Sequence, residues 1–134
     1  MNYLNLISLI FFALAGICNA IMDTLAHHHS ISKFAKYATG FWADANIVSW
    51  RNKYIDGNPD KGRIKIFGKI NKPEFLTDGW HLCKMLMVVL ICLSIITFTT
   101  FINPLYLLLA FIKYGLAWNF SFNLFYNYAL KKKL

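Results

Sequence analysis

Four side chains with acid–base or metal-binding chemistry occur in two short segments that lie far apart in the sequence. Asp23 and His27 are four residues apart in the first segment, and Asp78 and His81 are three residues apart in the second. In a helix, both spacings place the two side chains on one face. A carboxylate beside an imidazole is typical of a general acid–base pair, and the same groups are common metal ligands.

Two chemistries fit this set of residues, and a structural polar cluster is the third interpretation. In one, Asp23, His27, Asp78 and His81 hold a divalent metal, for which zinc, manganese and iron all suit mixed oxygen and nitrogen ligands. In the other, Asp23 and His81 are a metal-free catalytic acid–base pair. Basic and polar residues would then hold a phosphate or headgroup, and the candidates are Arg51, Lys53, Lys84 and Asn123.

The positions of Asp23 and His81 favour a direct pairing between them. Asp23 is an anion near the negative end of the first predicted helix, and a protonated His81 is a cation near the positive end of the second. Each charge is unfavourable alone, and each would offset the other if the two helices pack side by side. We therefore expect the two side chains to approach each other directly or through one bridging ligand.

Three long apolar segments must position these side chains. They span residues 4–26, 77–102 and 105–130, in a chain of 134 residues that is 57% hydrophobic and only 15% charged. A helix of about 20 apolar residues matches the ~30 Å hydrocarbon thickness of a bilayer. Gly16 and Ala20 provide a close-packing face on the first segment. The sequence predicts an all-α membrane protein, one domain over residues 1–134, with three transmembrane helices.

The segment between the first two apolar runs, residues 27–75, is predicted to be a long loop on the membrane surface. Within 30–42, Ile31, Phe34, Ala38 and Phe41 recur at helical spacing, which predicts a short interfacial amphipathic helix. Residues 63–67 alternate like a strand, but a single strand has no partner. We therefore expect an irregular loop there.

The distribution of basic residues predicts the orientation in the membrane. The loop contains nine of the fourteen Lys and Arg residues, and Lys131, Lys132 and Lys133 follow the third apolar segment. By the positive-inside rule, the loop and the C-terminus are cytoplasmic and the N-terminus is outside. The chain is thus expected to be a multi-pass protein of the cytoplasmic (inner) membrane.

The net charge of +8 is better explained by lipid than by nucleic acid. The loop contains no recognisable nucleic-acid-binding module, and its basic residues are interspersed with Gly, Ile and Asn without a stacking pattern. Basic residues beside a membrane attract anionic headgroups. The expected partners are therefore the bilayer and its anionic lipids, without nucleic acid.

Four motifs are similar to those of an uncharacterised group of small bacterial integral membrane proteins. They are Asn19-Ala-Ile-Met-Asp23, Phe41-Trp42, Ser49-Trp-Arg-Asn-Lys-Tyr54 and Thr77-Asp-Gly-Trp-His81. The resemblance covers roughly the first two-thirds of the chain and has no part in the third apolar segment. It implies no activity.

The sequence leaves three functional hypotheses, and whether the chain is an enzyme stays open. The first is a polar site at the cytoplasmic boundary that binds or modifies a lipid-like or phosphate-bearing small molecule. The second is a holin-like pore former of phage or bacterial origin, although the long aromatic loop argues against it. The third is an accessory subunit of a larger membrane complex; a homo-oligomer is compatible with each.

Overall fold

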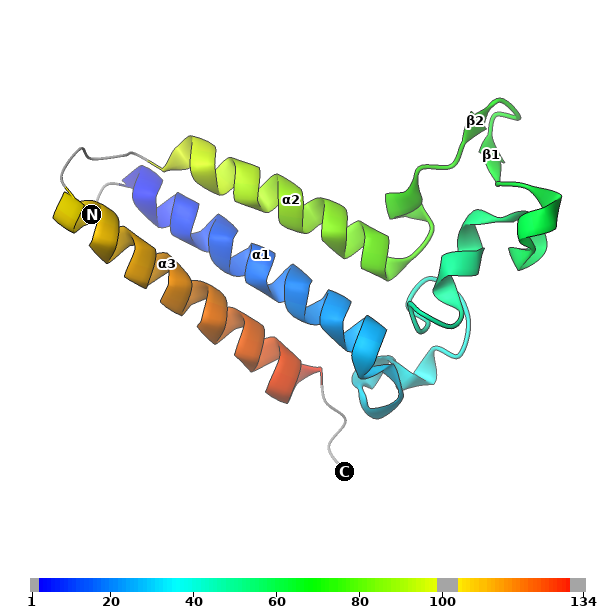
Figure 1. The fold of residues 1–134 in the computed structure, drawn as a ribbon, viewed down its shortest axis with the longest axis horizontal. Coiled ribbons are helices and arrows are strands. Elements are labelled where there is room, and N and C mark those ends of the chain that lie inside the picture. Colours follow the sequence, from blue (N-terminus) through cyan, green and yellow to red (C-terminus); the bar gives the residue numbers. More distant parts are fainter. Residues whose placement is uncertain (1–2, 99–103, 131–134) are drawn as a thin grey trace.

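Three long helices dominate the computed structural model, which describes residues 3–98 and 104–130. They are α1 (Tyr3–His27), α2 (Gly79–Thr97) and α3 (Pro104–Asn123), and α3 continues into a π-helix, η7 (Leu124–Ala129). Helix α1 lies between α2 and α3 and packs against both (Figure 1). Residues 99–103 and the basic residues 131–133 lie outside the described ranges.

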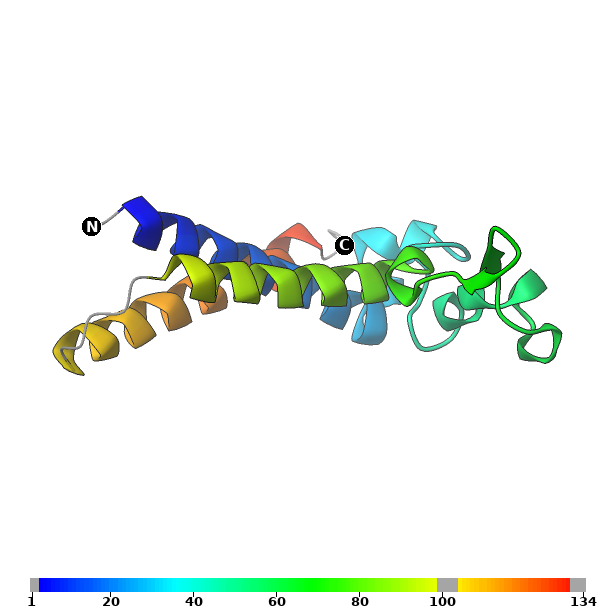
Figure 2. The ribbon, with the colours of Figure 1, turned by 90° about the horizontal axis from the view of Figure 1, so that it is seen from above.

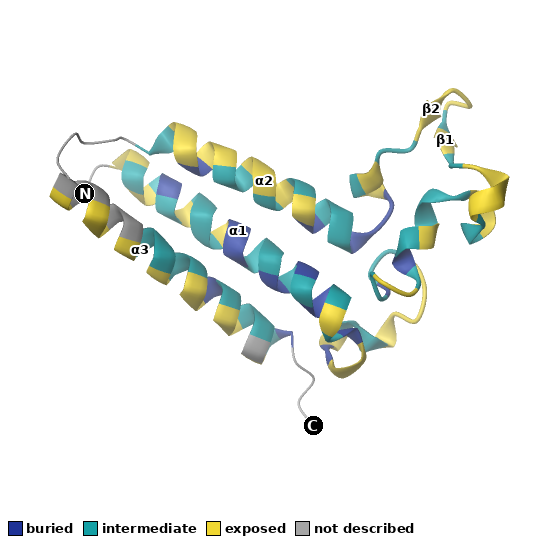
Figure 3. Ribbon diagram, viewed as in Figure 1, coloured by how far each residue is buried: buried dark blue, intermediate teal, exposed yellow. Residues whose placement is uncertain are grey.

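Helices α1 and α2 are long and apolar enough to cross a membrane. The most apolar 18-residue stretch has a mean hydropathy of 2.1 in α1 and 2.0 in α2. Among the described residues, these two helices are the ones with the length and hydropathy of a membrane span. The mostly helical fold and the two candidate membrane spans agree with the predicted helical membrane protein. The outward faces of the bundle carry large exposed apolar side chains, among them Ile96 (77% exposed) and Phe120 (71% exposed), as expected of a lipid-facing surface (Figure 3).

Small residues allow α1 to approach its neighbours closely. Gly16 and Ala20 are buried, as their spacing predicts. A Cβ atom on Gly16 would lie 2.5 Å from Ser121 Oγ and 3.2 Å from the Trp118 backbone oxygen. On the other side of α1, the thiols of Cys18 and Cys83 hydrogen-bond across the contact with α2. The bundle is therefore held by close contacts along α1.

The predicted amphipathic helix over 30–42 is replaced by two short 3₁₀ helices, η1 (His29–Ile31) and η2 (Lys33–Lys36). Ser32 separates them with extended backbone, φ −105° and ψ 174°. Its hydroxyl donates to the His29 backbone oxygen and accepts from the Phe34 backbone N–H. Serine favours such local bonds over a continuous helix, which explains the difference.

The loop also contains a small β-hairpin, so the expectation of an all-α fold with an irregular loop is corrected. Strand β1 (Lys65–Ile66) pairs antiparallel with β2 (Ile70–Asn71), and an isolated bridge joins Tyr54 to Arg63. Phe67 and Gly68 make the turn with positive φ of 53° and 71°. The alternating segment finds its partner across this turn, because Gly68 readily adopts that conformation.

The remaining elements of the loop are short 3₁₀ helices, and the segment that precedes them is bonded to the ends of α1 and α2. These helices are η3 (Ser49–Lys53), η4 (Ile55–Gly57), η5 (Pro59–Lys61) and η6 (Glu74–Leu76). Asn46 donates its amide to the Ala26 backbone oxygen at the end of α1. Gly79 N–H donates to the Phe41 oxygen at 2.7 Å, and the Trp42 ring occupies the space where a Gly79 Cβ would lie. The loop is thus docked on the α1 and α2 ends, as Figure 2 shows from above.

Candidate functional site

Asp78 begins α2 and orients His81. The Asp78 side chain is the helix N-cap, because its Oδ1 accepts the His81 backbone N–H at 2.9 Å. Its Oδ2 lies 2.8 Å from His81 Nδ1 and accepts the Thr77 hydroxyl at 3.1 Å. Asp78 is only 1% exposed. Asp78 thus starts α2, near the beginning of the apolar segment predicted over 77–102, and the same carboxylate holds the imidazole.

Glu74 is the second carboxylate on His81, and sequence reasoning missed it. Glu74 Oε2 lies 3.5 Å from His81 Nε2, on the opposite side of the ring from Asp78. It reaches this position because η6 turns back on α2, with Thr77 N–H and Thr77 Oγ1 both donating to the Glu74 backbone oxygen. Its proximity to Asp78 and His81 in the sequence was the only available signal.

Two basic residues complete what we call the Glu74 cluster, namely Lys53, Arg63, Glu74, Asp78 and His81. Arg63 Nη2 donates to Glu74 Oε1 at 2.8 Å, and Lys53 Nζ lies 3.9 Å from the same oxygen. The bridge from Tyr54 to Arg63 brings these two cations together. The hydrogen bond from Arg63 holds the pKa of Glu74 below its usual value, with a further contribution from the charge of Lys53.

Arg63 retains one unused donor. Its Nε is buried and has no hydrogen-bond partner among the described residues of the chain. Buried donors in proteins are nearly always satisfied, so an unsatisfied guanidinium N–H marks a place where an acceptor is expected. The neighbouring Nη2 is already committed to Glu74. Nε and Nη2 lie on the same side of the guanidinium, so the Nε–H group next to Glu74 is the donor left without an acceptor.

Four cations lie over aromatic rings in the loop and in the first turns of α2. Each pairs with the ring of an adjacent residue or of one a helical turn away, at centroid distances of 5.0 to 5.6 Å. The pairs are Lys36 with Tyr37, Arg51 with Trp50, Lys53 with Tyr54, and Lys84 with Trp80. Arg51 and Lys84, both headgroup candidates, are exposed. Aromatic rings and basic side chains are the residue types enriched at membrane–water interfaces.

The predicted partners on α1 do not join this cluster. No hydrogen bond or ion pair links Asp23 to His81 in the described structure, and Asp23 is half-buried on α1. His27 is exposed at the last position of α1. The carboxylates that contact the His81 imidazole are Asp78 and Glu74, both near the start of α2, because η6 positions Glu74 beside that end of the helix.

The four residues predicted as metal ligands do not gather in one group in the described structure. Within residues 3–98 and 104–130, no group of three or more His, Cys, Asp or Glu side chains could hold a metal ion. The proposed ligands Asp23 and His27 lie on α1, whereas Asp78 bonds to His81 and to Thr77. The four side chains therefore belong to different local networks.

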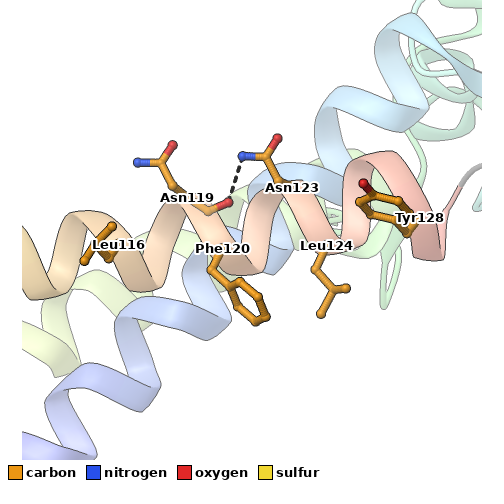
Figure 4. Close-up of a pocket in the computed structure, with 6 residues that line it drawn as sticks. All are labelled: Leu116, Asn119, Phe120, Asn123, Leu124 and Tyr128. Carbon is orange, nitrogen blue, oxygen red and sulfur yellow. Dashed lines mark hydrogen bonds between the residues drawn. The ribbon is translucent and has the colours of Figure 1, made fainter.

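Asn123, the last of the headgroup candidates, lies on the exposed face of α3. It donates its amide to the Asn119 backbone oxygen at 2.9 Å. It borders a shallow groove of about 300 Å³ on that helix, lined by Leu116, Asn119, Phe120, Asn123, Leu124 and Tyr128 (Figure 4). This surface belongs to α3 and its continuation η7 and is distinct from the Glu74 cluster.

The arrangement of the cluster defines what it can do chemically. With Asp78 accepting the Nδ1 proton, His81 presents Nε2 as the nitrogen that exchanges a proton or hydrogen-bonds a ligand. The side chain of His81 is 24% exposed, so Nε2 lies near the surface. Lys53 and Arg63, which both contact Glu74, supply positive charge next to it. Comparisons with protein-family models, curated proteins and solved structures gave no match.

Proposed function

We propose that this chain is a three-span membrane protein that binds the phosphate of an anionic lipid headgroup at the Glu74 cluster. The loop lies on the cytoplasmic surface, because nine of the fourteen Lys and Arg residues are in it. The N-terminus is then outside, and the short connection between α2 and α3 is outside as well.

The packing of α3 supports its role as the third span. The Phe12 ring packs against the rings of Tyr114 and Trp118, with ring centroids 5.4 and 5.2 Å apart. Further along α1, Gly16 packs against the Trp118 backbone, and His28 contacts Tyr126 at 5.2 Å. These contacts follow α1 for most of its length. If α1 crosses the bilayer, α3 crosses at the same depth.

The free Nε of Arg63 is the observation that carries the binding proposal. A guanidinium binds phosphate through its N–H donors, and the Nε–H group beside the Glu74 contact has no acceptor among the described residues. Lys53 and His81 lie on the same carboxylate, so both can contact an anion placed there. A phosphate oxygen would satisfy the buried donor and share the positive charge of Lys53.

The cation–aromatic pairs support a position of this cluster at the depth of lipid headgroups. Trp50 and Trp80 lie under Arg51 and Lys84, so each ring is next to a charge that anionic lipids attract. Aromatic rings of this kind sit between hydrocarbon and water. A lipid phosphate is therefore the anion that reaches the cluster at the highest local concentration.

The test is binding of phosphatidic acid and phosphatidylcholine to the full chain in detergent, measured by native mass spectrometry. The wild type should prefer phosphatidic acid. Arg63→Lys keeps the charge beside Glu74 but removes the N–H fork. A hydrogen bond to a charged group contributes roughly 1.5–3 kcal/mol, so this variant should bind phosphatidic acid at least about tenfold more weakly.

Lys61→Gln is the matched control, because Lys61 pairs with Asp56 at 2.8 Å and both side chains are exposed, outside the cluster. It should bind like the wild type. Equal binding of the two lipids, or equal effects of Arg63→Lys and Lys61→Gln, would contradict the proposal. Loss of membrane potential on induced expression would favour the pore-forming alternative instead.

Acid–base chemistry on the bound phosphate is the second candidate function. It is favoured by the 2.8 Å contact between Asp78 and His81 Nδ1, which leaves Nε2 to deliver a proton to a leaving oxygen. Water would attack phosphorus, and the lipid alcohol would leave with that proton. Release of inorganic phosphate from phosphatidic acid by the wild type, abolished in His81→Gln, is the expected result. No release by the wild type would restrict the function to binding.

A further inference from the structure

Two carboxamide side chains lie exposed along the outward face of α3. Asn119 donates its amide to the Gly115 backbone oxygen, and Asn123 donates to the Asn119 backbone oxygen, each at 2.9 Å. Figure 4 shows the two side chains on the same side of the helix. Amides on the exposed face of an apolar helix are unusual, because they oppose burial in lipid.

Asn119 lies near mid-depth of the bundle. The preceding residue, Trp118, contacts the Phe12 ring at 5.2 Å, and its backbone oxygen would lie 3.2 Å from a Cβ on Gly16. Gly16 is close to the middle of α1, which runs from Tyr3 to His27. If α1 crosses the bilayer, the Asn119 amide is in the hydrocarbon region, far from either headgroup layer.

The surroundings of the amides have the spacing of a helix–helix seam. Leu116, Asn119 and Asn123 follow one another at intervals of three and four residues, which is the heptad repeat of two packed helices. Phe120 and Leu124 border the same groove of about 300 Å³ and are 71% and 43% exposed. A groove bordered by large exposed apolar side chains is suited to receive the side chains of a second helix.

We infer that this face of α3 binds the α3 helix of a second copy of the chain, forming a parallel dimer. All copies insert in the same orientation, so a two-fold axis along the membrane normal brings identical residues together at the same depth. A carboxamide is both donor and acceptor, so Asn119 and Asn123 can each pair with their own counterparts. An acyl chain can fill the groove but offers the amides no hydrogen bond.

Disulfide trapping in native membranes tests the geometry. In the Cys92→Ser variant, Asn119→Cys should form a dimer on mild oxidation. Val88→Cys is the control, since Val88 is 51% exposed on the outward face of α2 and at a similar depth. Cys18 and Cys83 are not replaced, because neither is exposed and their free thiols hydrogen-bond to each other. Equal cross-linking at positions 119 and 88, or none at 119, would overturn the inference.

Dimer affinity in lipid vesicles, measured by energy transfer between labelled copies, tests the role of the amides. An interhelical hydrogen bond in a membrane is worth about 0.6 kcal/mol, so Asn119→Leu should weaken the dimer about threefold and the Asn119→Leu/Asn123→Leu variant up to tenfold. Ile96→Ala, on the exposed face of α2, should leave the dimer unchanged.

A monomeric wild type, or a double leucine variant that associates like the wild type, would overturn the dimer. A series of species larger than a dimer would also overturn it, because that indicates association through more than one face. The inference rests on α3 crossing the bilayer beside α1 and does not rest on lipid binding. Arg63→Lys should therefore leave dimerisation unchanged, which separates a failure of either proposal from the other.

Discussion

Ser8 and Ser94 form a reciprocal pair across the contact between α1 and α2. Ser8 Oγ donates to the Ser94 backbone oxygen at 2.7 Å, and Ser94 Oγ lies 3.0 Å from the Ser8 backbone oxygen, to which it donates. Tyr114 adds α3 to the pair, since its hydroxyl donates to Ser8 Oγ at 2.6 Å. One buried polar group thus joins all three helices, where water is not present to replace a lost bond.

Ser8→Ala should lower the free energy of unfolding by about 1 kcal/mol or more, because it removes a donor to α2 and leaves the Tyr114 hydroxyl with only the longer, 3.4 Å bond to the Asn5 backbone oxygen. Ser94→Ala should cost less, since Tyr114 keeps its partner. Thr97→Val is the control, because Thr97 bonds only within its own helix. Reversible unfolding in mixed micelles measures all three, and equal losses for Ser8→Ala and Thr97→Val would contradict the interhelical role.

Gly16→Ala should separate α1 from α3. The added methyl group would lie 2.5 Å from Ser121 Oγ and 3.2 Å from the Trp118 backbone oxygen, which cannot move without shifting α3. We expect a loss of about 1–3 kcal/mol, the usual range for overpacking. Gly115→Ala is the matched control on α3, because nothing lies within 4 Å of its added Cβ. Its better helix propensity should leave the unfolding free energy unchanged or raise it, and the opposite order of the two variants would disprove this account of the packing.

The pH dependence of stability should report the Glu74 cluster. The hydrogen bond from Arg63 lowers the folded-state pKa of Glu74, so the ionised form stabilises the fold. That stabilisation is fully present above the unfolded pKa of about 4.3 and is lost as pH falls through the lower folded pKa. Unfolding temperatures of the wild type and Glu74→Gln should therefore converge below about pH 4. A constant difference between the two at all pH values would show that Glu74 does not act through its charge.

The orientation proposed for the chain can be read by labelling with an impermeant thiol reagent in intact cells. A cysteine in place of Asn58, in the loop, should be protected, whereas a cysteine in place of Asn103 should react from outside. The native cysteines are replaced by serine for this measurement. Labelling at position 58 and protection at position 103 would reverse the topology.

Local features of the sequence determined the helices and their start points. The apolar length of α1 and α2 is a property of consecutive residues, so it can be compared directly with the bilayer thickness. The N-cap role of Asp78 is local in the same way, because it involves a backbone N–H three residues further along. Gly16 and Ala20 were recognisable as a packing face for the same reason.

The tertiary structure decided which charges meet. The carboxylates that contact His81 are Asp78 and Glu74 rather than Asp23. The reason is that the path of the loop brings η6 against the first turn of α2. That path depends on contacts between residues far apart, such as the Gly79 N–H to the Phe41 oxygen and the bridge from Tyr54 to Arg63. Helix periodicity and dipole arguments consider one element at a time, so they could not place Arg63 and Lys53 on Glu74. Hydrophobic length is encoded in consecutive residues, whereas the pairing of charges is set by how the loop folds back onto the bundle.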